Sequence, residues 1–526
     1  MPDKVLSLIK PRKYQSEIYE NCKDKNCLVV LPTGIGKTLI ALMLSIYTQK
    51  KFPGTKTLFL APTRPLAEQH LAYFKKHLPE LFAQLVLFTG KIDAEKRKEL
   101  WETSDIIFST PQCIGNDLRK NLYSLEDTSL LIEDECHRCL KNYAYTYVAE
   151  KYKEQAKNKR ILGLTASPGT DKSTIQQIAK NLGIEAIEIR TRESEDVKEY
   201  LQELEFEIIR LDFPDEIKQI TKIIKDMYSK KIEELKNRKL LFGPPTKTNI
   251  IQLQGKIMGS ISKGNKNFNL LSGASAAAQA IKLSYLIELL ETQTLHSSIE
   301  YIKSMFKQAA ENKSRAVKQI IKSPEFNKAY IELNGLIARN IEHPKLLELK
   351  GLIEKSIKEN PKNKTIVFSQ YRETVIKICK TLNEIKGINA KVFVGQSKGK
   401  GENNPGLSQK EQQEIMNEFR QGKINVIAAT SIGEEGLDIP EVNSVIFYEP
   451  IPSAIRKIQR AGRTARLMKG KLIILLTNDT LDEIFHYASK AKEKRMYNSL
   501  DEIKHDLDNG ISIYKEDKEE KQETLF

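Results

Sequence analysis

The stretch LPTGIGKTLIAL, residues 31–42, indicates the fold of the chain, because it contains a glycine-rich loop between an expected strand and an expected helix. An apolar run, CLVVL (27–31), leads into it, and an apolar helical pattern begins near Leu39. Because glycine has no Cβ, such a loop can curl and direct successive backbone N–H groups at phosphate oxygens. The start of the following helix adds partial positive charge. We therefore expect a strand, a phosphate-binding loop and a helix. The residues expected to hold the nucleotide are Pro32, Thr33, Gly34, Ile35, Gly36, Lys37 and Thr38.

Two side chains of this loop have predicted roles in ATP chemistry. Lys37 can reach the β- and γ-phosphates, and the Thr38 hydroxyl can ligate Mg²⁺. The strict phosphate-loop spacing fails at its first position, where Leu31 stands instead of glycine. A glycine turn without a ligand is the alternative. Gly-x-Gly-Lys-Thr after a strand favours a nucleotide site, and we expect ATP and Mg²⁺ as cofactors.

A magnesium site also needs carboxylates at the end of a strand, and the segment LLIEDECHR (130–138) supplies them. Asp134 follows the apolar run and can hold the metal directly or through water. Glu135 can orient or deprotonate the attacking water. Glu133 competes for these roles, but we expect it to face elsewhere in the strand.

The hydrophobic pattern predicts an α/β fold with two parallel-sheet domains and an all-helical domain between them. Short continuous apolar runs are typical of strands buried on both faces of a parallel sheet. Such runs alternate with helical patterns at both ends of the chain, whereas residues 215–345 show helical patterns alone. The expected strands are 27–31, 57–61, 85–88, 105–109, 130–133, 161–165, 364–369, 390–395, 425–430, 444–449 and 471–477. The expected domains are 1–205 (ATP-binding), 206–345 (helical), 346–505 (second α/β domain) and 506–526 (a charged, disordered tail).

The second α/β domain contains residues that can complete the ATP site. In QRAGRTAR (459–466), Arg463 and Arg466 lie one helical turn apart beside Gln459, and planar guanidinium groups stabilise charge on a transferring phosphoryl group. Asp438, in ATSIGEEGLDIP (429–440), is suited to accept a hydrogen bond from a ribose hydroxyl. A basic helix that contacts nucleic acid directly is the alternative for the arginines. Hydrolysis residues divided between two domains suggest a cleft that closes on ATP and opens after hydrolysis.

Composition narrows the class of protein further. Among 526 residues, 84 Lys and Arg exceed 69 Asp and Glu by 15, which favours a polyanionic partner, with nucleic acid first. A solvated lysine surface is the alternative. The six cysteines form no disulfide ladder, and CHRC (136–139) lacks a second Cys/His pair for zinc. No signal peptide or apolar run approaching ~18 residues is evident. We expect a soluble, cytoplasmic protein with no membrane span.

In their order along the chain, these motifs resemble those of superfamily 2 helicases. The set comprises RKYQ (12–15), LPTGIGKT (31–38), APTRPLAEQ (61–69), TG (89–90), STPQ (109–112), DECH (134–137), TAS (165–167), IVFSQYRET (366–374), FVGQ (393–396), ATSIGEEGLDIP (429–440) and QRAGRTAR (459–466). The resemblance implies two RecA-like motor domains. It also implies that Arg12 and Gln15 read adenine, and that Thr165 and Ser167 couple the ATP state to the nucleic-acid track.

The same resemblance implies a row of residues that contact the phosphates of the nucleic acid, since hydroxyl and amide groups suit phosphates. Phosphates carry no sequence information, so binding should not depend on base sequence and should weaken as salt rises. The expected residues of this row, the nucleic-acid track, are Arg64, Thr89, Gly90, Thr110, Gln370, Gln396 and Thr430.

Within the superfamily the chain most resembles the helicase part of the archaeal Hef group, kin of the Fanconi anaemia M-type translocases. The supporting segments are NYAYTYVAEKY (142–152), LLETQ (289–293), HPKLLELK (343–350), GLSQKEQ (406–412), YEPIPSAIRKIQRAGRT (448–464) and KEKRMY (492–497). The resemblance implies that the helical domain grips branched or double-stranded DNA as a thumb would.

Three departures from that group bear on function. Cys136 stands where the group usually has alanine, and the resulting DECH form also occurs in double-stranded RNA sensors and Dicer-type helicases. Ala461 and Ala465 replace the usual arginine and glycine. The Hef nuclease and its helix-hairpin-helix motifs do not follow the motor, so we expect remodelling without cutting, unless a separate nuclease partner exists.

We expect an ATP-dependent DNA helicase or translocase that acts on forked and branched DNA. Two alternatives stay open, namely an ATPase stimulated by double-stranded RNA and a fork-binding scaffold with incidental ATPase activity. The tail KQETLF (521–526) resembles a short sliding-clamp peptide through Gln522, Leu525 and Phe526, although such patterns also arise by chance in disordered tails.

Overall fold

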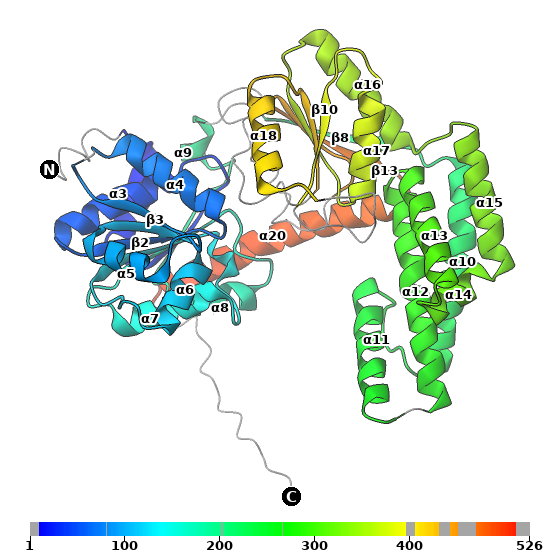
Figure 1. The fold of residues 1–526 in the computed structure, drawn as a ribbon, viewed down its shortest axis with the longest axis horizontal. Helices are drawn as coiled ribbons and strands as arrows, with labels where there is room; N and C mark the ends of the chain where they lie inside the picture. Colours follow the sequence, from blue (N-terminus) through cyan, green and yellow to red (C-terminus); the bar gives the residue numbers. More distant parts are fainter. Residues whose placement is uncertain are drawn as a thin grey trace, which may run out of the picture.

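Two parallel β-sheets and a helical bundle make up the protein, as a computed structural model shows (Figure 1). The structure describes residues 10–79, 81–200, 204–265, 267–395, 406–430, 442–450 and 470–511. The expected α/β fold with a helical domain between two parallel-sheet domains is confirmed.

The first sheet has seven parallel strands in the order β3-β4-β2-β5-β6-β1-β7. The strands are β1 (Cys27–Val30), β2 (Lys56–Leu60), β3 (Leu85–Phe88), β4 (Ile106–Ser109), β5 (Thr128–Asp134), β6 (Ile161–Thr165) and β7 (Ala186–Ile189). The covering helices are α2 (Lys13–Cys22), α3 (Lys37–Lys51), α4 (Arg64–His77), α5 (Ala94–Thr103), α6 (Pro111–Arg119), α7 (Ala144–Gln155), α8 (Lys172–Leu182) and α9 (Glu195–Lys198), with the short 3₁₀ helix η1 (Cys136–Arg138) after β5. The central strands are continuously apolar because alternate side chains enter different cores: Leu28 and Val30 pack on one face, and Cys27 and Val29 on the other.

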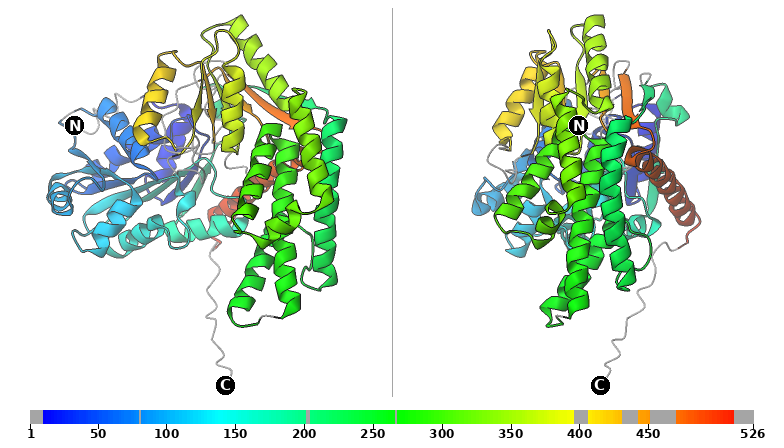
Figure 2. Two further views of the ribbon diagram at one scale, coloured as in Figure 1. Left: turned by 45° about the vertical axis from the view of Figure 1, so that its right-hand side comes forward. Right: turned by 90° about the vertical axis from the view of Figure 1, so that its right-hand side faces the viewer.

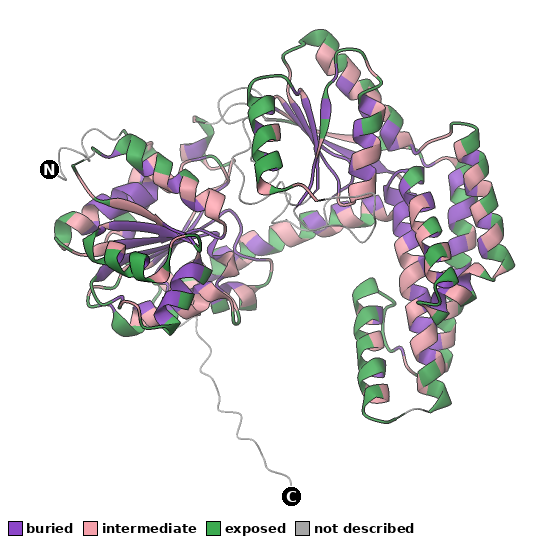
Figure 3. Cartoon of the chain, in the orientation of Figure 1, coloured by how far each residue is buried: buried purple, intermediate pink, exposed green. Residues whose placement is uncertain are grey.

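The second sheet has six parallel strands in the order β10-β11-β9-β12-β13-β8. The strands are β8 (Leu204–Leu211), β9 (Thr365–Phe368), β10 (Ala390–Phe393), β11 (Val426–Ala429), β12 (Ser444–Phe447) and β13 (Gly470–Thr477). Helices α16 (Pro344–Glu359), α17 (Arg372–Leu382) and α18 (Gln409–Arg420) belong to this domain. In Figure 3 the central strands of both sheets are buried and the outward faces of their helices are exposed.

All eleven expected strands are present, but two strands were missed. Both lie at sheet edges: β7 (AIEI) ends the first sheet and β8 (LEFEIIRL) ends the second. Edge strands read as alternating apolar and polar residues, so a search for continuous apolar runs overlooks them. Because β8 pairs in parallel with β13, the chain enters the second sheet before it enters the helical bundle. The expected domain boundary at 205/206 falls inside this strand.

The helical domain consists of α10 (Asp215–Asn237), α11 (Lys247–Ser262), α12 (Phe268–Thr292), α13 (Leu295–Ala310), α14 (Arg315–Ile321) and α15 (Pro324–Ala338), which project from the second sheet domain (Figure 2). Its central helix, α12, is long and apolar enough to cross a membrane by length and composition alone, a test that the core helix of a soluble protein also passes, and the expectation of no membrane span stays a prediction. Its apolar residues Leu283, Leu286 and Leu290 pack against α10 and α13 in a buried core, which explains its composition within this fold.

Buried polar contacts attach the helical bundle to the second sheet domain. The hydroxyls of Ser369 and Thr374 donate to Oε1 of Gln293 at 3.1 and 2.9 Å, and all three side chains are buried. Nearby, the amine of Lys345 on α16 donates at 2.6 Å to the Thr292 carbonyl at the end of α12 and at 2.7 Å to Asp482 Oδ2 on α20 (Leu481–Asp508), and the side chains of Lys345 and Asp482 are fully buried. A buried charge that loses its partner is costly, so these contacts specify how the bundle sits on its neighbour.

One long helix joins the two sheet domains. α20 (Leu481–Asp508) follows β13 of the second sheet and runs across to the first domain (Figure 1). Its residues Met496, Leu500 and Ile503 are fully buried in the core that also contains Ile178 of α8 and Ile187 of β7. Residues late in the chain therefore complete the core of the first domain.

Candidate nucleotide-binding site

The strand order brings the predicted nucleotide-binding residues to one edge of the first sheet. The phosphate loop follows β1, Thr165 ends β6 and Asp134 ends β5, and these three strands are neighbours in the order β5-β6-β1. Ligands of open parallel sheets bind outside the carboxyl ends of the strands. The topology thus assembles segments that are far apart in the sequence.

The phosphate loop has the curled backbone that its glycines predict. Gly34 and Gly36 have φ of 86° and 89°, in the left-handed region that favours glycine. Gly36 caps the N-terminus of α3. A Cβ at Gly36 would lie 2.1 Å from Nε2 of Gln15, so a side chain there would require the Gln15 amide to move.

Helix α2 supports the loop from behind. The buried Gln15 lies with its Nε2 3.3 Å from the carbonyl oxygen of Ile35 and accepts a hydrogen bond from the Arg12 N–H at 2.9 Å. The Tyr14 hydroxyl donates to the same Ile35 carbonyl at 2.6 Å. The Arg12 guanidinium lies 5.1 Å from the ring centroid of Tyr200. Both ends of the Gln15 amide thus contact protein groups, and adenine reading by Arg12 and Gln15 stays a prediction.

Lys37 and Glu135 interact electrostatically within this site. The Lys37 amine donates to the Leu31 carbonyl at 3.3 Å. Burial opposes ionisation of Glu135, but the charge of Lys37 and the neighbouring His137 and Arg138 together hold the pKa of its carboxyl below the usual range. Glu135 is therefore a carboxylate at neutral pH, the form that a base requires.

The backbone at Glu135 is unusual in a way typical of functional sites. Its φ of 53° and ψ of 45° are left-handed, which non-glycine residues seldom adopt. Its Oε2 lies 3.3 Å from Nδ1 of His137. This turn follows the end of β5, and the consecutive carboxyl groups of Glu133, Asp134 and Glu135 have different surroundings.

Glu133 has the opposite environment. It is fully buried, and neither carboxyl oxygen has a hydrogen-bond partner in the described part of the chain. Burial raises the pKa of Glu133 well above its usual range, which favours its neutral form. This distinction favours Asp134 and Glu135 over Glu133 for metal and water chemistry.

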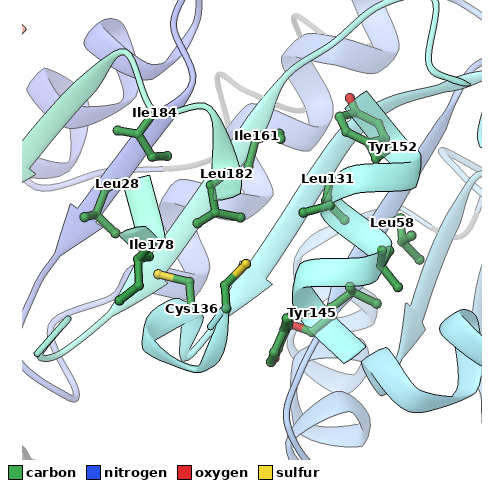
Figure 4. Packing of buried hydrophobic residues seen from close by; sticks show 14 of the residues in the cluster. Leu28, Leu58, Leu131, Cys136, Tyr145, Tyr152, Ile161, Ile178, Leu182 and Ile184 are labelled. Atoms are coloured by element: carbon green, nitrogen blue, oxygen red, sulfur yellow. The ribbon is translucent and has the colours of Figure 1, made fainter. Parts of the chain in front are cut away.

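The core beneath this strand end is tightly packed. Cys136 and Tyr145 lie in the same cluster as Leu58 and Leu182 (Figure 4). The Tyr145 hydroxyl donates to the backbone carbonyl of Asp134 at 2.6 Å. Cys136 thus occupies a buried apolar position.

His70 is a residue of this site that the sequence reasoning missed. It lies on α4 directly after the motif APTRPLAEQ, and its ring is buried. Nε2 of His70 lies 2.9 Å from Asp134 Oδ2, and Nδ1 lies 3.4 Å from the Thr38 hydroxyl. A single histidine inside a helical pattern gave no signal in the sequence, because its two partners come from separate segments.

The residues present suit Mg²⁺ chemically. Mg²⁺ prefers oxygen ligands such as a hydroxyl and a carboxylate. The Thr38 hydroxyl and the Asp134 carboxylate both contact the imidazole ring of His70, so they lie close together. Among the described residues no group of three His, Cys, Asp or Glu side chains could hold a metal by itself. That is consistent with magnesium chemistry, since Mg²⁺ usually takes one or two protein ligands together with substrate phosphates and water.

The motif TAS links this site to α20, the helix that joins the two sheet domains. The Thr165 hydroxyl lies 3.2 Å from Nδ1 of His137 and donates to the Ser167 carbonyl at 3.1 Å. The Ser167 hydroxyl donates to the Met496 sulfur on α20. A continuous set of contacts therefore runs from Glu135 to the helix that joins the two domains.

Comparison with known proteins places the chain in a family. Residues 8–170 match the family described as "Type III restriction enzyme, res subunit", residues 345–468 match "Helicase conserved C-terminal domain", and residues 216–343 match "Putative ATP-dependent RNA helicase, helical bundle". The crystal structure of the Pyrococcus furiosus Hef helicase domain is 42% identical and has a TM-score of 0.70, with 92% of this chain and 99% of that chain covered. The chain belongs to the Hef-type superfamily 2 helicases.

Among the curated relatives of this Hef-type helicase, one is named as an RNA helicase and another as a DNA helicase. A putative ATP-dependent RNA helicase of Methanocaldococcus jannaschii is 37% identical over 93% of this chain and 61% of its own length. The ATP-dependent DNA helicase mph1 of Neurospora crassa is 31% identical (95% and 44%), and the Fanconi anemia group M protein homolog of Mus musculus is 30% identical (93% and 26%). The chain thus spans about three fifths or less of these relatives.

In this Hef-type helicase the predicted track residues follow the remaining strands of the same edge. Thr89 and Gly90 follow β3, Thr110 follows β4, and Arg64 begins α4 after β2. Thr89 is buried, Gly90 is exposed, and the Arg64 guanidinium donates to Glu68 at 2.7 Å.

In the second sheet, Gln370 and Thr430 follow the neighbouring strands β9 and β11. Gln370 is half-buried, Thr430 is buried, and the backbone N–H of Gln370 donates to Glu449. Nucleic-acid contacts of all these residues stay predictions. The remaining predicted site and partner residues lie outside the described part of the chain: Gln396, Asp438, Gln459, Arg463, Arg466, Gln522, Leu525 and Phe526.

Proposed function

We propose that this Hef-type helicase is an ATP-dependent DNA helicase or translocase that remodels forked and branched DNA. The observation that carries the proposal is the shared carboxyl edge of the first sheet. The phosphate loop, Asp134 and Thr165 occupy one half of that edge, and the predicted track segments occupy the other half. A change in the bound nucleotide can therefore alter contacts to the nucleic acid through neighbouring strands.

In this proposal each residue of the first domain has a distinct task. The loop N–H groups and Lys37 bind the phosphates, and Thr38 and Asp134 would hold Mg²⁺, which supplies charge neutralisation at the β- and γ-phosphates. The Glu135 carboxylate accepts a proton from the attacking water. Its low pKa suits orientation of the water at neutral pH. In the second domain Gln459, Arg463 and Arg466 stabilise charge on the γ-phosphoryl group, and Asp438 accepts from the ribose.

Branched DNA as the substrate is supported by the relatives named as DNA helicases and by the similarity to the Hef helicase domain. The net charge of +15 supports a polyanionic partner. Backbone contacts predict sequence-blind binding whose affinity falls steeply with salt. We assign the grip on the duplex to the helical domain.

A second candidate is an ATPase that acts on duplex RNA. The M. jannaschii relative is named a putative RNA helicase, the helical-bundle family carries the same description, and the DECH form points the same way. A fork-binding scaffold is the third candidate, and the presence of Lys37, Glu135, Arg463 and Arg466 argues against it.

A panel of substrates tests the proposal. ATPase rates and strand displacement are measured at matched salt with forked DNA, Holliday junctions, linear duplex DNA and duplex RNA. We expect the stimulation of ATP hydrolysis and the ATP-dependent strand displacement to be greatest with branched DNA. Greater stimulation by duplex RNA would replace the proposal with the second candidate, and tight fork binding without remodelling would favour the scaffold.

The sliding-clamp contact through Gln522, Leu525 and Phe526 and the cytoplasmic location stay predictions from the sequence. A pull-down with purified clamp, with a Phe526→Ala chain as the control, tests the clamp contact.

A further inference from the structure

His70 occupies a rigid position between the phosphate loop and the acidic strand end. Its ring is 7% exposed and packs against Phe59 of β2, with ring centroids 4.4 Å apart. Phe59 in turn stacks on Phe108 at 5.3 Å and meets Phe74 edge-on at 5.9 Å. A buried imidazole held by this aromatic cluster has little freedom to rotate.

The partners of the ring determine which nitrogen carries the proton. An ionised carboxylate can only accept hydrogen bonds, so Nε2 of His70 donates to Asp134 at 2.9 Å. In the tautomer with its proton on Nε2, Nδ1 is an acceptor, and the Thr38 hydroxyl lies 3.4 Å from it, placed to donate. In that tautomer the Thr38 hydroxyl uses its proton on the ring and keeps its oxygen lone pairs for another partner.

We propose that His70 is a positioning residue that orients Thr38 and Asp134 for Mg²⁺, an inference that rests on the proposed function. One imidazole sets the direction of the hydroxyl and the carboxylate together, and Asp134 keeps its second oxygen for the metal or its water. Outer partners that orient ligand side chains typically change metal affinity or activity about 10–100-fold when removed. The geometry assigns no contact between His70 and the nucleotide.

A structural role alone is the competing explanation, because His70 also connects α4 to β5 and α3. The two roles differ in what they change. A structural histidine affects the free energy of unfolding, whereas an orienting histidine affects the magnesium dependence of ATP binding in a protein that is still folded.

The test uses the full chain with His70→Ala, His70→Gln and the control His77→Ala. His77 lies on the same helix but is exposed, with Nδ1 2.8 Å from the carbonyl oxygen of Tyr73. Equilibrium binding of a fluorescent ATP analogue is titrated with Mg²⁺ and repeated in EDTA, and thermal unfolding is followed in parallel.

For His70→Ala we expect the Mg²⁺ concentration at half-maximal effect to rise about tenfold or more, with binding in EDTA changed less than twofold. His70→Gln, whose amide offers a donor and an acceptor, should recover part of the loss, and His77→Ala should match the wild type. An unchanged magnesium dependence in either folded His70 variant overturns the inference. A wild type without magnesium-dependent ATP binding would instead contradict the proposed function.

Discussion

The hydroxyl of Ser167 donates a hydrogen bond to the sulfur of Met496 at 2.8 Å, across 329 positions of sequence. Ser167 follows β6 in the first domain, and Met496 lies on α20, which starts at β13 of the second. Both side chains are buried. The contact attaches the helix that joins the two domains to the edge of the sheet that carries the acidic motif.

Replacing Met496 tests how firmly α20 is anchored. Met496→Ala removes a fully buried side chain from the first-domain core and should lower the free energy of unfolding by about 2–5 kcal/mol. Met496→Leu keeps the volume and should cost under about 1.5 kcal/mol. Denaturant unfolding measures both, with the exposed Lys490→Ala as control. Equal stability of Met496→Ala and the control would mean that α20 is not anchored there.

Lys37→Ala should lower DNA-stimulated ATP hydrolysis at least about a hundredfold, because the amine is the loop cation expected at the β- and γ-phosphates. A phosphate-release assay on purified protein measures the rate, and forked-DNA binding without nucleotide shows that the variant is folded. A rate close to the wild type would exclude the loop as the ATP site.

Glu135→Gln and Glu133→Gln form a matched pair on one strand end. Glu135 is ionised, so its amide variant should bind ATP but hydrolyse it about 10²–10⁴ times more slowly. Glu133 is fully buried and its pKa is raised by burial, so its amide variant should hydrolyse ATP at nearly the wild-type rate. Single-turnover hydrolysis together with nucleotide binding separates the two effects. Reversal of this order would exchange the roles of the two carboxyls.

Gly36→Ala should weaken ATP binding, because φ is 89° and the new methyl group would displace the Gln15 amide that supports the loop. Gly54→Ala has a comparable φ of 79° with nothing within 4 Å of the added Cβ, so it isolates the backbone strain of about 1–2 kcal/mol. ATP affinity and thermal unfolding are measured for both. Normal ATP affinity of Gly36→Ala would show that Gln15 and α2 move to accommodate the new methyl group without disturbing the loop.

Acidification should destabilise the protein through His343, which is fully buried and donates from Nε2 to the Glu291 carbonyl at 3.2 Å. Burial, with the charge of Lys345, holds the pKa of His343 well below its ordinary value of 6.5. Between those two pKa values the unfolded chain binds the extra proton, so stability falls as pH drops below about 6.5, by up to about 1.4 kcal/mol per pH unit. His343→Asn should flatten this part of the pH dependence in chemical denaturation, and an unchanged slope would exclude His343.

Local chemistry made much of the site predictable. The glycines of the phosphate loop, Lys37, Thr38 and the consecutive carboxylates act within short segments, and continuous apolar runs revealed the central strands. β7 and β8 were not predicted, because apolar and polar side chains alternate in strands at a sheet edge. α12 has the length and composition of a membrane span, because the core of a helical bundle and a bilayer both favour apolar residues.

The sequence by itself determined the two parallel-sheet domains, the helical domain between them and the glycine turn between β1 and α3, since each depends on residues close to one another along the chain. Only the tertiary structure decided that His70 meets both Thr38 and Asp134, that β8 belongs to the second sheet and that α20 completes the first core. These relationships join segments separated by tens to hundreds of residues. Their physical basis is burial and hydrogen bonding between elements, which hydrophobic periodicity within one segment does not encode.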